Sequence, residues 1–160
     1  MRQCLSSSAL SLFKNSCYRK IDFKIQEDAF VHHAVKRFTA YNIGCLAVTN
    51  QHHHVVGILS ERDYIHKFSA ARQDDKVVQI KDICTYDSDM IARQNDSIEQ
   101  CMDKMLMKDC RHLLVVDDGN ECMGLISMKD VIRALMTDKN NVITRLSNFN
   151  SGRGGYFGSE

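Results

Sequence analysis

The stretch Gly57-Ile58-Leu59-Ser60-Glu61-Arg62-Asp63-Tyr64-Ile65 returns later in the chain as Gly124-Leu125-Ile126-Ser127-Met128-Lys129-Asp130-Val131-Ile132. Both copies read glycine, two apolar residues, serine, two variable residues and aspartate, followed by further apolar residues. The residues upstream correspond as well, since the apolar run 43–48 matches the run 111–116. The chain therefore contains one unit twice, and a duplicated unit of this size predicts a two-fold-related pair with a site in the cleft between the copies.

Each copy has the hydrophobic pattern of a strand, a helix, two strands and a second helix. In the first copy, residues 20–25 alternate as a strand does, and residues 30–38 place apolar side chains on one helical face. In the second copy, residues 98–106 repeat apolar side chains at helical spacing. Asp96 with Glu99 predicts a capping box at the start of that helix.

A single unit would leave one face of its sheet uncovered, and two units packed face to face bury that surface. We therefore predict an α/β (α+β) fold in which two β-α-β-β-α repeats pack as a pseudo-two-fold pair. The predicted first repeat with its linker spans residues 21–76, and the second repeat spans 77–138. Residues 139–160 are expected to form a C-terminal extension and a mobile Gly/Ser-rich tail.

The composition is that of a soluble globular protein, with 44% hydrophobic residues, 26% charged residues and a formal net charge of +1. This charge argues against nucleic-acid or membrane-surface binding through bulk electrostatics, and no apolar run approaches the length that spans a bilayer. The 7 cysteines show no CxxC pair and no zinc-ligand spacing, which indicates free thiols in a reducing compartment. The run His52-His53-His54 predicts a solvated loop rather than a metal site.

Residues 1–20 are basic, rich in serine and free of acidic side chains. This composition is typical of an organelle transit peptide, and a weak apolar helical stripe favours the mitochondrial type, with the matrix as destination. The alternative is a disordered or family-specific extension, and the protein would then be cytoplasmic.

The repeated motif combines residue types that bind nucleotides. It lies where a strand ends and a helix begins, and the first N–H groups of a helix attract anions. A serine hydroxyl can donate to a phosphate or sugar oxygen, and a carboxylate can accept from both hydroxyls of a ribose. Arg62 and Lys129 add positive charge for a phosphate. Ser-x-x-Asp is also a capping box, so a structural and a ligand-binding interpretation both stay open.

The motif, the duplication and the run Arg111-His112-Leu113 resemble tandem CBS domains, a Bateman module, over residues 21–138. Within that resemblance, Leu114 stands where proline is usual, and the linker ends in Ile83-Cys84-Thr85 where Ile-Met-Thr is common. The leader and the C-terminal tail are similar to those of stand-alone mitochondrial CBS-pair proteins of plants.

The resemblance implies that an adenosine ligand such as AMP, ATP, NAD(H) or S-adenosylmethionine binds in the clefts between the repeats. Asp63 and Asp130 would hold ribose hydroxyls, with Ser60 and Ser127 beside them. The side chains that would face phosphate are Arg62, Lys129, Arg111 and His112, and those that would line the base pocket are Ile43, Gly44, Cys45 and Leu113.

We therefore expect a regulatory module and not an enzyme, one that senses an adenosine nucleotide and modulates a partner protein. The resemblance implies a thioredoxin-type redox partner and a homodimer. The sequence shows no nucleophile–base pair, metal set or glycine-rich phosphate loop. Two alternatives remain. One is a ligand-independent interaction scaffold, and the other is a small thiol enzyme acting through Cys110, which lies beside Arg111 at a predicted helix end.

Overall fold

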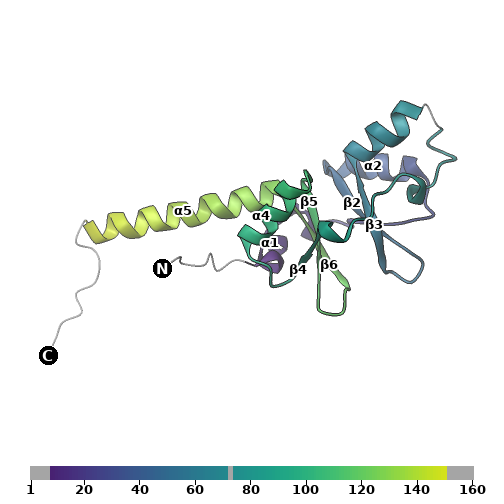
Figure 1. Cartoon of the computed structure of the whole chain (residues 1–160). Coiled ribbons are helices and arrows are strands. Elements are labelled where there is room, and N and C mark those ends of the chain that lie inside the picture. The colour runs from purple at the N-terminus through teal and green to yellow at the C-terminus, as the bar shows by residue number, and fades with distance from the viewer. Residues whose placement is uncertain (1–7, 72–73, 151–160) are drawn as a thin grey trace.

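A computed structural model of the chain describes residues 8–71 and 74–150, and the same order of elements occurs in its two halves (Figure 1). The first half contains β1 (Lys24–Gln26), α2 (Val31–Tyr41), β2 (Cys45–Thr49), β3 (Val55–Ser60) and α3 (Glu61–Asp63), which continues as a helical turn over Tyr64–Phe68. The second half contains β4 (Ile91–Arg93), α4 (Ile98–Met107), β5 (His112–Val116), β6 (Cys122–Ser127) and α5 (Met128–Asn150). This order confirms the predicted repeat.

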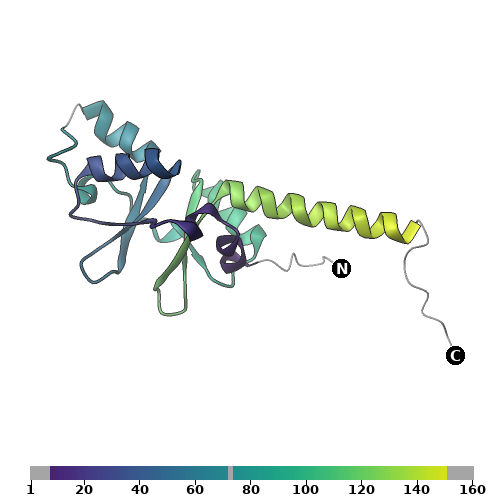
Figure 2. The same cartoon turned by 180° about the vertical axis from the view of Figure 1, so that it is seen from behind.

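Shorter helices connect these elements. The helix α1 (Ala9–Lys14) precedes the first repeat, and the structure also contains short 3-10 helices at Cys17–Lys20, Ser69–Ala71, Ile80–Asp82 and Ser88–Met90. In the view from behind, the N-terminal segment crosses to the second repeat and lies beside α5 (Figure 2).

Each repeat forms its own three-stranded sheet, in the orders β1-β2-β3 and β4-β5-β6. The first strand of each sheet is parallel to the middle strand, and the third strand is antiparallel to it. The register is the same in both sheets, since Cys45 pairs with Ser60 and His112 pairs with Ser127. The last strand of each sheet therefore delivers its motif serine to the same structural position.

The core joins the two repeats. The middle strand β2 is buried at all its residues, as expected for a strand covered on both faces. Leu114 and Leu125 of the second sheet belong to the same buried cluster as Leu46 and Ile58 of the first. The two units therefore bury apolar surface against each other, as the predicted packing required.

The motif glycine allows a neighbouring segment to approach each sheet closely. A Cβ atom at Gly57 would lie 2.9 Å from the carbonyl oxygen of Thr85, which belongs to the segment before β4. At Gly124 a Cβ would overlap the ring of Phe13, which belongs to the segment before β1. The segment that precedes each repeat therefore packs on the opposite repeat, and only glycine leaves room for it.

The N-terminal residues are folded where the structure describes them. Ala9 and Leu12 of α1 are buried, at 0% and 3% exposure, in the core cluster of the second repeat. The expectation of a disordered extension is therefore wrong for residues 8–20, because the weak apolar stripe packs instead of facing water. Residues 1–7 lie outside the described residues. The first strand also begins later than predicted, at Lys24.

The predicted capping box of α4 is displaced by one residue. Ser97 is the N-cap, and its side chain accepts from the N–H of Gln100 while the Gln100 side chain accepts from the N–H of Ser97. Asp96 instead forms an ion pair with Lys104 at 2.7 Å. The backbone conformation decides this, since Ser97 is the last extended residue before the helix.

The helix α5 continues through much of the expected C-terminal extension, to Asn150, and projects away from the two sheets (Figure 1). The expected mobile tail over residues 151–160 lies outside the described residues. Within the described part of the chain, no helix combines the length and apolar character needed to cross a membrane.

Candidate functional site

The two motif aspartates are held by reciprocal hydrogen bonds with the motif serines. Ser60 donates to Asp63 Oδ2 from its backbone N–H at 2.9 Å and from its hydroxyl at 2.7 Å, and Ser60 Oγ accepts from the N–H of Asp63. Ser127 and Asp130 make the same three contacts. The structural interpretation of Ser-x-x-Asp is therefore correct, and the capping box also fixes both carboxylates in position.

Asp63 receives two further hydrogen bonds on its other oxygen. Thr85 donates its hydroxyl at 2.8 Å, and the ammonium group of Lys67 lies 3.0 Å from the same Oδ1 atom. Burial raises the pKa of Asp63, but the hydrogen bonds from Ser60, Thr85 and Lys67 outweigh it and hold the pKa below its ordinary value. Asp63 is therefore an ionised hydrogen-bond acceptor at neutral pH.

A pocket of about 220 Å³ lies beside Asp63 between the two repeats, and we call it the first cleft. It brings together seven of the residues that the sequence predicts for the site: Gly44, Cys45, Ser60, Arg62, Asp63, Arg111 and His112. Sequence reasoning names Cys110 only as a candidate thiol, and the lining residues that it missed are Ile58, Thr85, Asp87, Met90, Lys108 and Asp109. Most of these missed residues precede β4 or follow α4, where no repeated motif marks them.

The first cleft carries positive side chains that are paired with acidic neighbours. Arg62 lies 3.2 Å from Asp109, and Lys108 lies 2.6 Å from Asp89 and 3.4 Å from Asp87. These pairs are at the surface, where an ion pair contributes little to stability. A phosphate group can therefore replace the acidic partner of Arg62 or Lys108 at a small cost in folding free energy.

A second cleft, of about 250 Å³, lies on the other side of Arg111 and His112. We call it the second cleft, and of the predicted site residues it contains Ile43, Gly44, Arg111, His112, Ser127 and Lys129. It is also lined by Cys17, Tyr18, Asn42, Glu61 and Met128. Glu61 is the only carboxylate among the described residues that line it, because Asp130 is not one of them.

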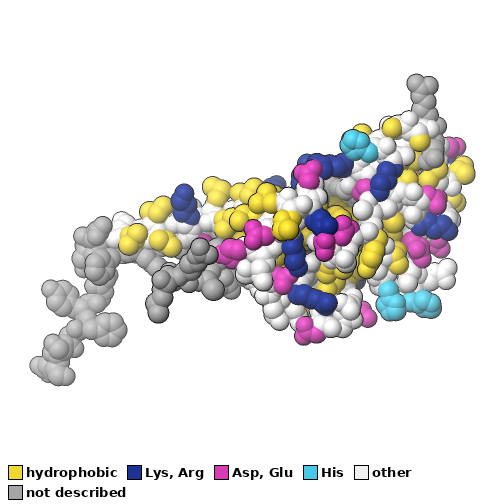
Figure 3. All heavy atoms as spheres, viewed as in Figure 1, with side chains coloured by type: hydrophobic (Ala, Val, Ile, Leu, Met, Phe, Trp, Pro, Cys, Tyr) yellow, Lys and Arg dark blue, Asp and Glu magenta, His cyan; other side chains and the backbone are white. Residues whose placement is uncertain are grey.

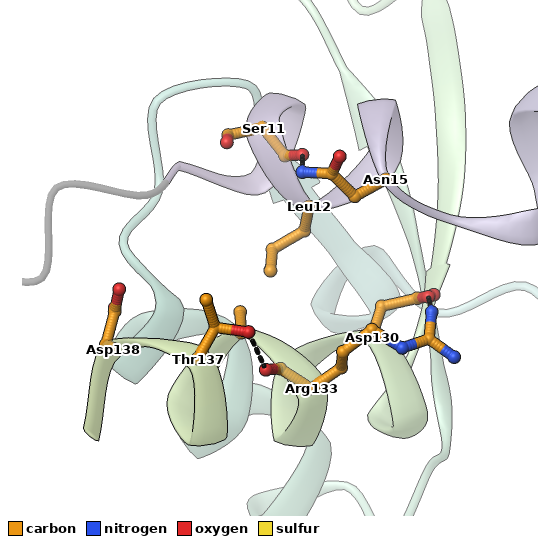
Figure 4. Close-up of a pocket in the computed structure, with 8 residues that line it drawn as sticks. Ser11, Leu12, Asn15, Asp130, Arg133, Thr137 and Asp138 are labelled. Atoms are coloured by element: carbon orange, nitrogen blue, oxygen red, sulfur yellow. Dashed lines mark hydrogen bonds and ion pairs between the residues drawn. The ribbon is translucent and has the colours of Figure 1, made fainter. Parts of the chain in front are cut away.

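Asp130 faces the N-terminal segment. It is 6% exposed, and its Oδ2 atom accepts a hydrogen bond of 2.9 Å from the hydroxyl of Ser16. It lines a different pocket, of about 420 Å³, between α1 and α5, with Arg133 at 3.8 Å (Figure 4). The duplicated motif therefore places one carboxylate in a cleft between the repeats and buries the other.

Leu113 does not reach either cleft. It is 0% exposed and belongs to the core cluster of the second repeat. The base-pocket role that the resemblance implied for Leu113 is therefore not supported, because the β5 side chain at this position points into the core.

His112 lies between the two clefts and is neutral at physiological pH. Burial and the nearby Arg111 lower its pKa to about 4, although Asp130 opposes the shift. The Nε2 atom is 3.1 Å from the hydroxyl of Tyr18, and the two rings meet edge to face with centroids 5.9 Å apart. A neutral His112 can contribute a hydrogen bond to a ligand but no positive charge.

The thiols in the first cleft are not activated. Burial raises the pKa of both Cys45 and Cys110. A reactive cysteine needs a lowered pKa, so Cys110 lacks the property that a thiol enzyme requires. Among residues 8–71 and 74–150, no three metal-ligating side chains gather to hold a metal ion.

The chain therefore consists of two paired strand-helix-strand-strand-helix repeats with clefts between them. The family model of the CBS domain matches residues 19–70 and 80–137, which is more than half of the chain. The chain therefore belongs to the CBS domain family, as a tandem CBS-pair protein.

In sequence, the chain is similar to the CBS domain-containing protein CBSX3, mitochondrial, of Arabidopsis thaliana, with 30% identity over 94 residues. The match covers 57% of this chain and 46% of the relative, so this chain matches less than half the length of that protein.

Solved structures share the fold. A protein with CBS domains from Burkholderia ambifaria is 28% identical, with a TM-score of 0.72, and the match covers 82% of this chain and 96% of that chain. Protein PAE2072 of Pyrobaculum aerophilum, complexed with AMP, is 21% identical with a TM-score of 0.68 and coverages of 78% and 89%. The CBS domain pair of MJ0100, in complex with 5'-methylthioadenosine and S-adenosyl-L-methionine, is 21% identical with a TM-score of 0.68 and coverages of 82% and 98%.

Proposed function

We propose that this chain is a non-catalytic regulatory module that binds an adenosine nucleotide in the first cleft. The observation that carries the proposal is Asp63, an ionised carboxylate at the edge of a cleft between the repeats, with Arg62 and Lys108 in the same cleft. A carboxylate accepts hydrogen bonds from the two hydroxyls of a ribose, and the cations complement a phosphate. Two proteins of the same fold were solved with AMP or with S-adenosylmethionine and methylthioadenosine.

Ligand binding in the first cleft would change the contacts of the linker between the repeats. Oδ1 of Asp63 is held by Thr85 and Lys67, so a ribose hydroxyl must share or displace these donors. Lys67 also donates to the backbone carbonyl of Ile83, which belongs to the same linker. Occupation of the cleft would therefore be communicated to the segment that leads into the second repeat.

A partner protein would bind to α5, the helix that projects from the two repeats. Hydrophobic side chains gather along α5 (Figure 3), and those with the largest exposure are Ile132, Met136, Val142, Ile143 and Leu146. Such a surface favours association with a second copy or with a regulated protein. It also favours the second candidate function, a scaffold that binds partners without a ligand.

The finer assignments extend this proposal. The relative in Arabidopsis thaliana is named as mitochondrial, which supports a mitochondrial location. A leader removed on import would have to end before Ser8 for α1 to keep its packing. A thioredoxin-type protein is the first partner to test, and a homodimer is the expected assembly. Both can be measured by light scattering of the chain alone and after mixing with thioredoxin.

A thermal-shift panel of the full chain tests the ligand class. The ligands are AMP, ADP, ATP, NAD, NADH and S-adenosylmethionine. A ligand at 100 times its dissociation constant stabilises the folded state by about 2.7 kcal/mol, which raises the unfolding temperature by several degrees. At least one adenosine ligand is expected to do so. If all six leave the unfolding temperature unchanged at millimolar concentration, the nucleotide proposal is wrong and the scaffold is favoured.

A further inference from the structure

The two clefts differ most in the segment that precedes each repeat. Ser60 and Ser127 are 67 residues apart, and so are Tyr18 and Thr85. Thr85 forms a bridge with Ile58 of β3, and Tyr18 packs in the same buried cluster as Leu125, the residue of β6 that matches Ile58. Tyr18 therefore stands beside the second cleft where Thr85 stands beside the first, and a large aromatic side chain replaces a small one.

Tyr18 is buried and forms part of the wall of the second cleft. Its side chain is 2% exposed, and its ring meets the ring of His112 edge to face at an interplanar angle of 89°. Its hydroxyl lies 3.1 Å from Nε2 of His112. An aromatic ring with a satisfied hydroxyl in a buried position is a stable occupant of the space that it fills.

Ser16 completes this arrangement from the same segment. It is 4% exposed, and its hydroxyl donates to Oδ2 of Asp130 at 2.9 Å across a sequence separation of 114 residues. The same Ser16 oxygen accepts from the N–H of Tyr18, so the two residues are linked to each other. The N-terminal segment therefore supplies a hydroxyl donor to the Oδ2 atom of Asp130, the atom that the capping box with Ser127 also uses.

We propose that the segment Ser16–Tyr18 closes the nucleotide position of the second repeat: Ser16 binds Asp130 outside the second cleft, and the ring of Tyr18 forms part of the wall of that cleft beside His112. The module then takes one adenosine nucleotide, in the first cleft, and the second cleft becomes a binding site only when the segment is displaced. This inference rests on the proposed function, since both clefts are assigned the same class of ligand.

The test counts AMP sites by equilibrium dialysis on the full chain. The wild type is expected to bind one AMP, and Tyr18→Phe, which keeps the ring, is expected to bind one as well. Tyr18→Thr copies the residue of the first cleft and is expected to bind two. The additional site should disappear in Tyr18→Thr/Asp130→Asn. Circular dichroism and the unfolding midpoint check that each variant is folded.

The results separate this inference from the proposed function. Two AMP sites in the wild type, or one site in folded Tyr18→Thr, would overturn the inference that the N-terminal segment closes the second position. The variant Asp63→Asn tests the inference with Tyr18 unchanged. It is expected to bind no AMP, and a remaining AMP site that depends on Asp130 would overturn the inference. If the wild type binds no AMP while Tyr18→Thr binds one AMP at Asp130, the proposed function is refuted and the inference stands. If neither protein binds AMP, the proposed function and the inference are both refuted.

Discussion

Thr85 donates its hydroxyl hydrogen to Oδ1 of Asp63 at 2.8 Å, although 22 residues separate them in the sequence. Through this contact the segment before β4 is attached to the last residue of α3 in the first repeat. The carboxylate that is proposed to receive a ligand is therefore also a structural link between the repeats. A ligand bound at Asp63 would share its Oδ1 atom with the linker, so the proposed ligand binding would be coupled to the position of the linker at one atom.

Arg62 is expected to recognise phosphate and to contribute little to folding. Its pairing with Asp109 is exposed, so Arg62→Ala should change the free energy of unfolding by less than about 0.5 kcal/mol. Loss of a charge-assisted contact to the ligand should weaken AMP binding by about tenfold. Adenosine, which has no phosphate, should bind both proteins equally. Titration calorimetry measures both ligands.

The matched control for Arg62→Ala is Arg93→Ala. Arg93 is also exposed, and it donates to Asp117 and Asn120 in a loop away from the first cleft. A loss of AMP affinity that is the same in both variants would mean that general positive charge, and not a site at Arg62, attracts the nucleotide.

Stability is expected to fall between about pH 6.5 and pH 4 because of His112. Its pKa is lowered to about 4 in the folded state, from 6.5, mainly by burial. The unfolded chain therefore binds a proton first as the pH falls, and stability that is complete above pH 6.5 is lost toward pH 4. The expected loss from this group is about 3 kcal/mol. Urea unfolding at several pH values measures this loss of unfolding free energy. In His112→Gln the loss between pH 6.5 and pH 4 should be smaller by that amount. If the unfolding free energies of the wild type and His112→Gln change with pH in the same way, His112 is not the cause.

The motif glycines are expected to resist substitution. An alanine at Gly57 would place its Cβ against the backbone of Thr85, so Gly57→Ala should cost about 1–3 kcal/mol of unfolding free energy by overpacking. Gly119→Ala is the control, since its nearest neighbour is a side-chain oxygen of Asp117 at 3.3 Å in an exposed loop. Denaturant melts compare the two variants, and an equal small effect would show that the linker moves aside freely.

The segment 8–20 is expected to be part of the stable fold. A chain that starts at Ile21 loses the buried side chains of Leu12 and Tyr18, each of which contributes about 1.5–3 kcal/mol when buried. It should therefore unfold at a clearly lower temperature than a chain that starts at Ser8. Scanning calorimetry of the two proteins provides the comparison. Equal unfolding temperatures would mean that the packing of α1 contributes nothing to stability.

Local patterns in the sequence were sufficient to predict the repeat and the position of the motif. The apolar spacing gave the order of strands and helices, and the Ser60-to-Asp63 spacing gave both the cap and the carboxylate at the cleft. These features depend on neighbours within four residues along the chain, which a periodic pattern records. The capping error at Asp96 is of the same local kind, since two adjacent polar residues compete for one position and the backbone selects Ser97.

The residues that were missed depend on contacts between distant segments. Thr85 reaches Asp63, Ser16 reaches Asp130, and Tyr18 reaches His112 only because the segment before each repeat crosses to the opposite repeat. No spacing in a single sequence reports such a crossing. For the same reason the two equivalent aspartates were assigned equal roles, although the fold makes one accessible and buries the other.

The most direct test of the central claim is the affinity of AMP for the full chain, measured by titration calorimetry for the wild type, Asp63→Asn and Asp130→Asn. Loss of a hydrogen bond to a carboxylate costs about 1–3 kcal/mol, so Asp63→Asn should bind AMP roughly 5- to 150-fold more weakly. Asp130→Asn should bind AMP as the wild type does, within about twofold, because Asp130 is covered by Ser16. Unchanged affinity in Asp63→Asn, or a loss confined to Asp130→Asn, would contradict the assignment of the nucleotide to the first cleft.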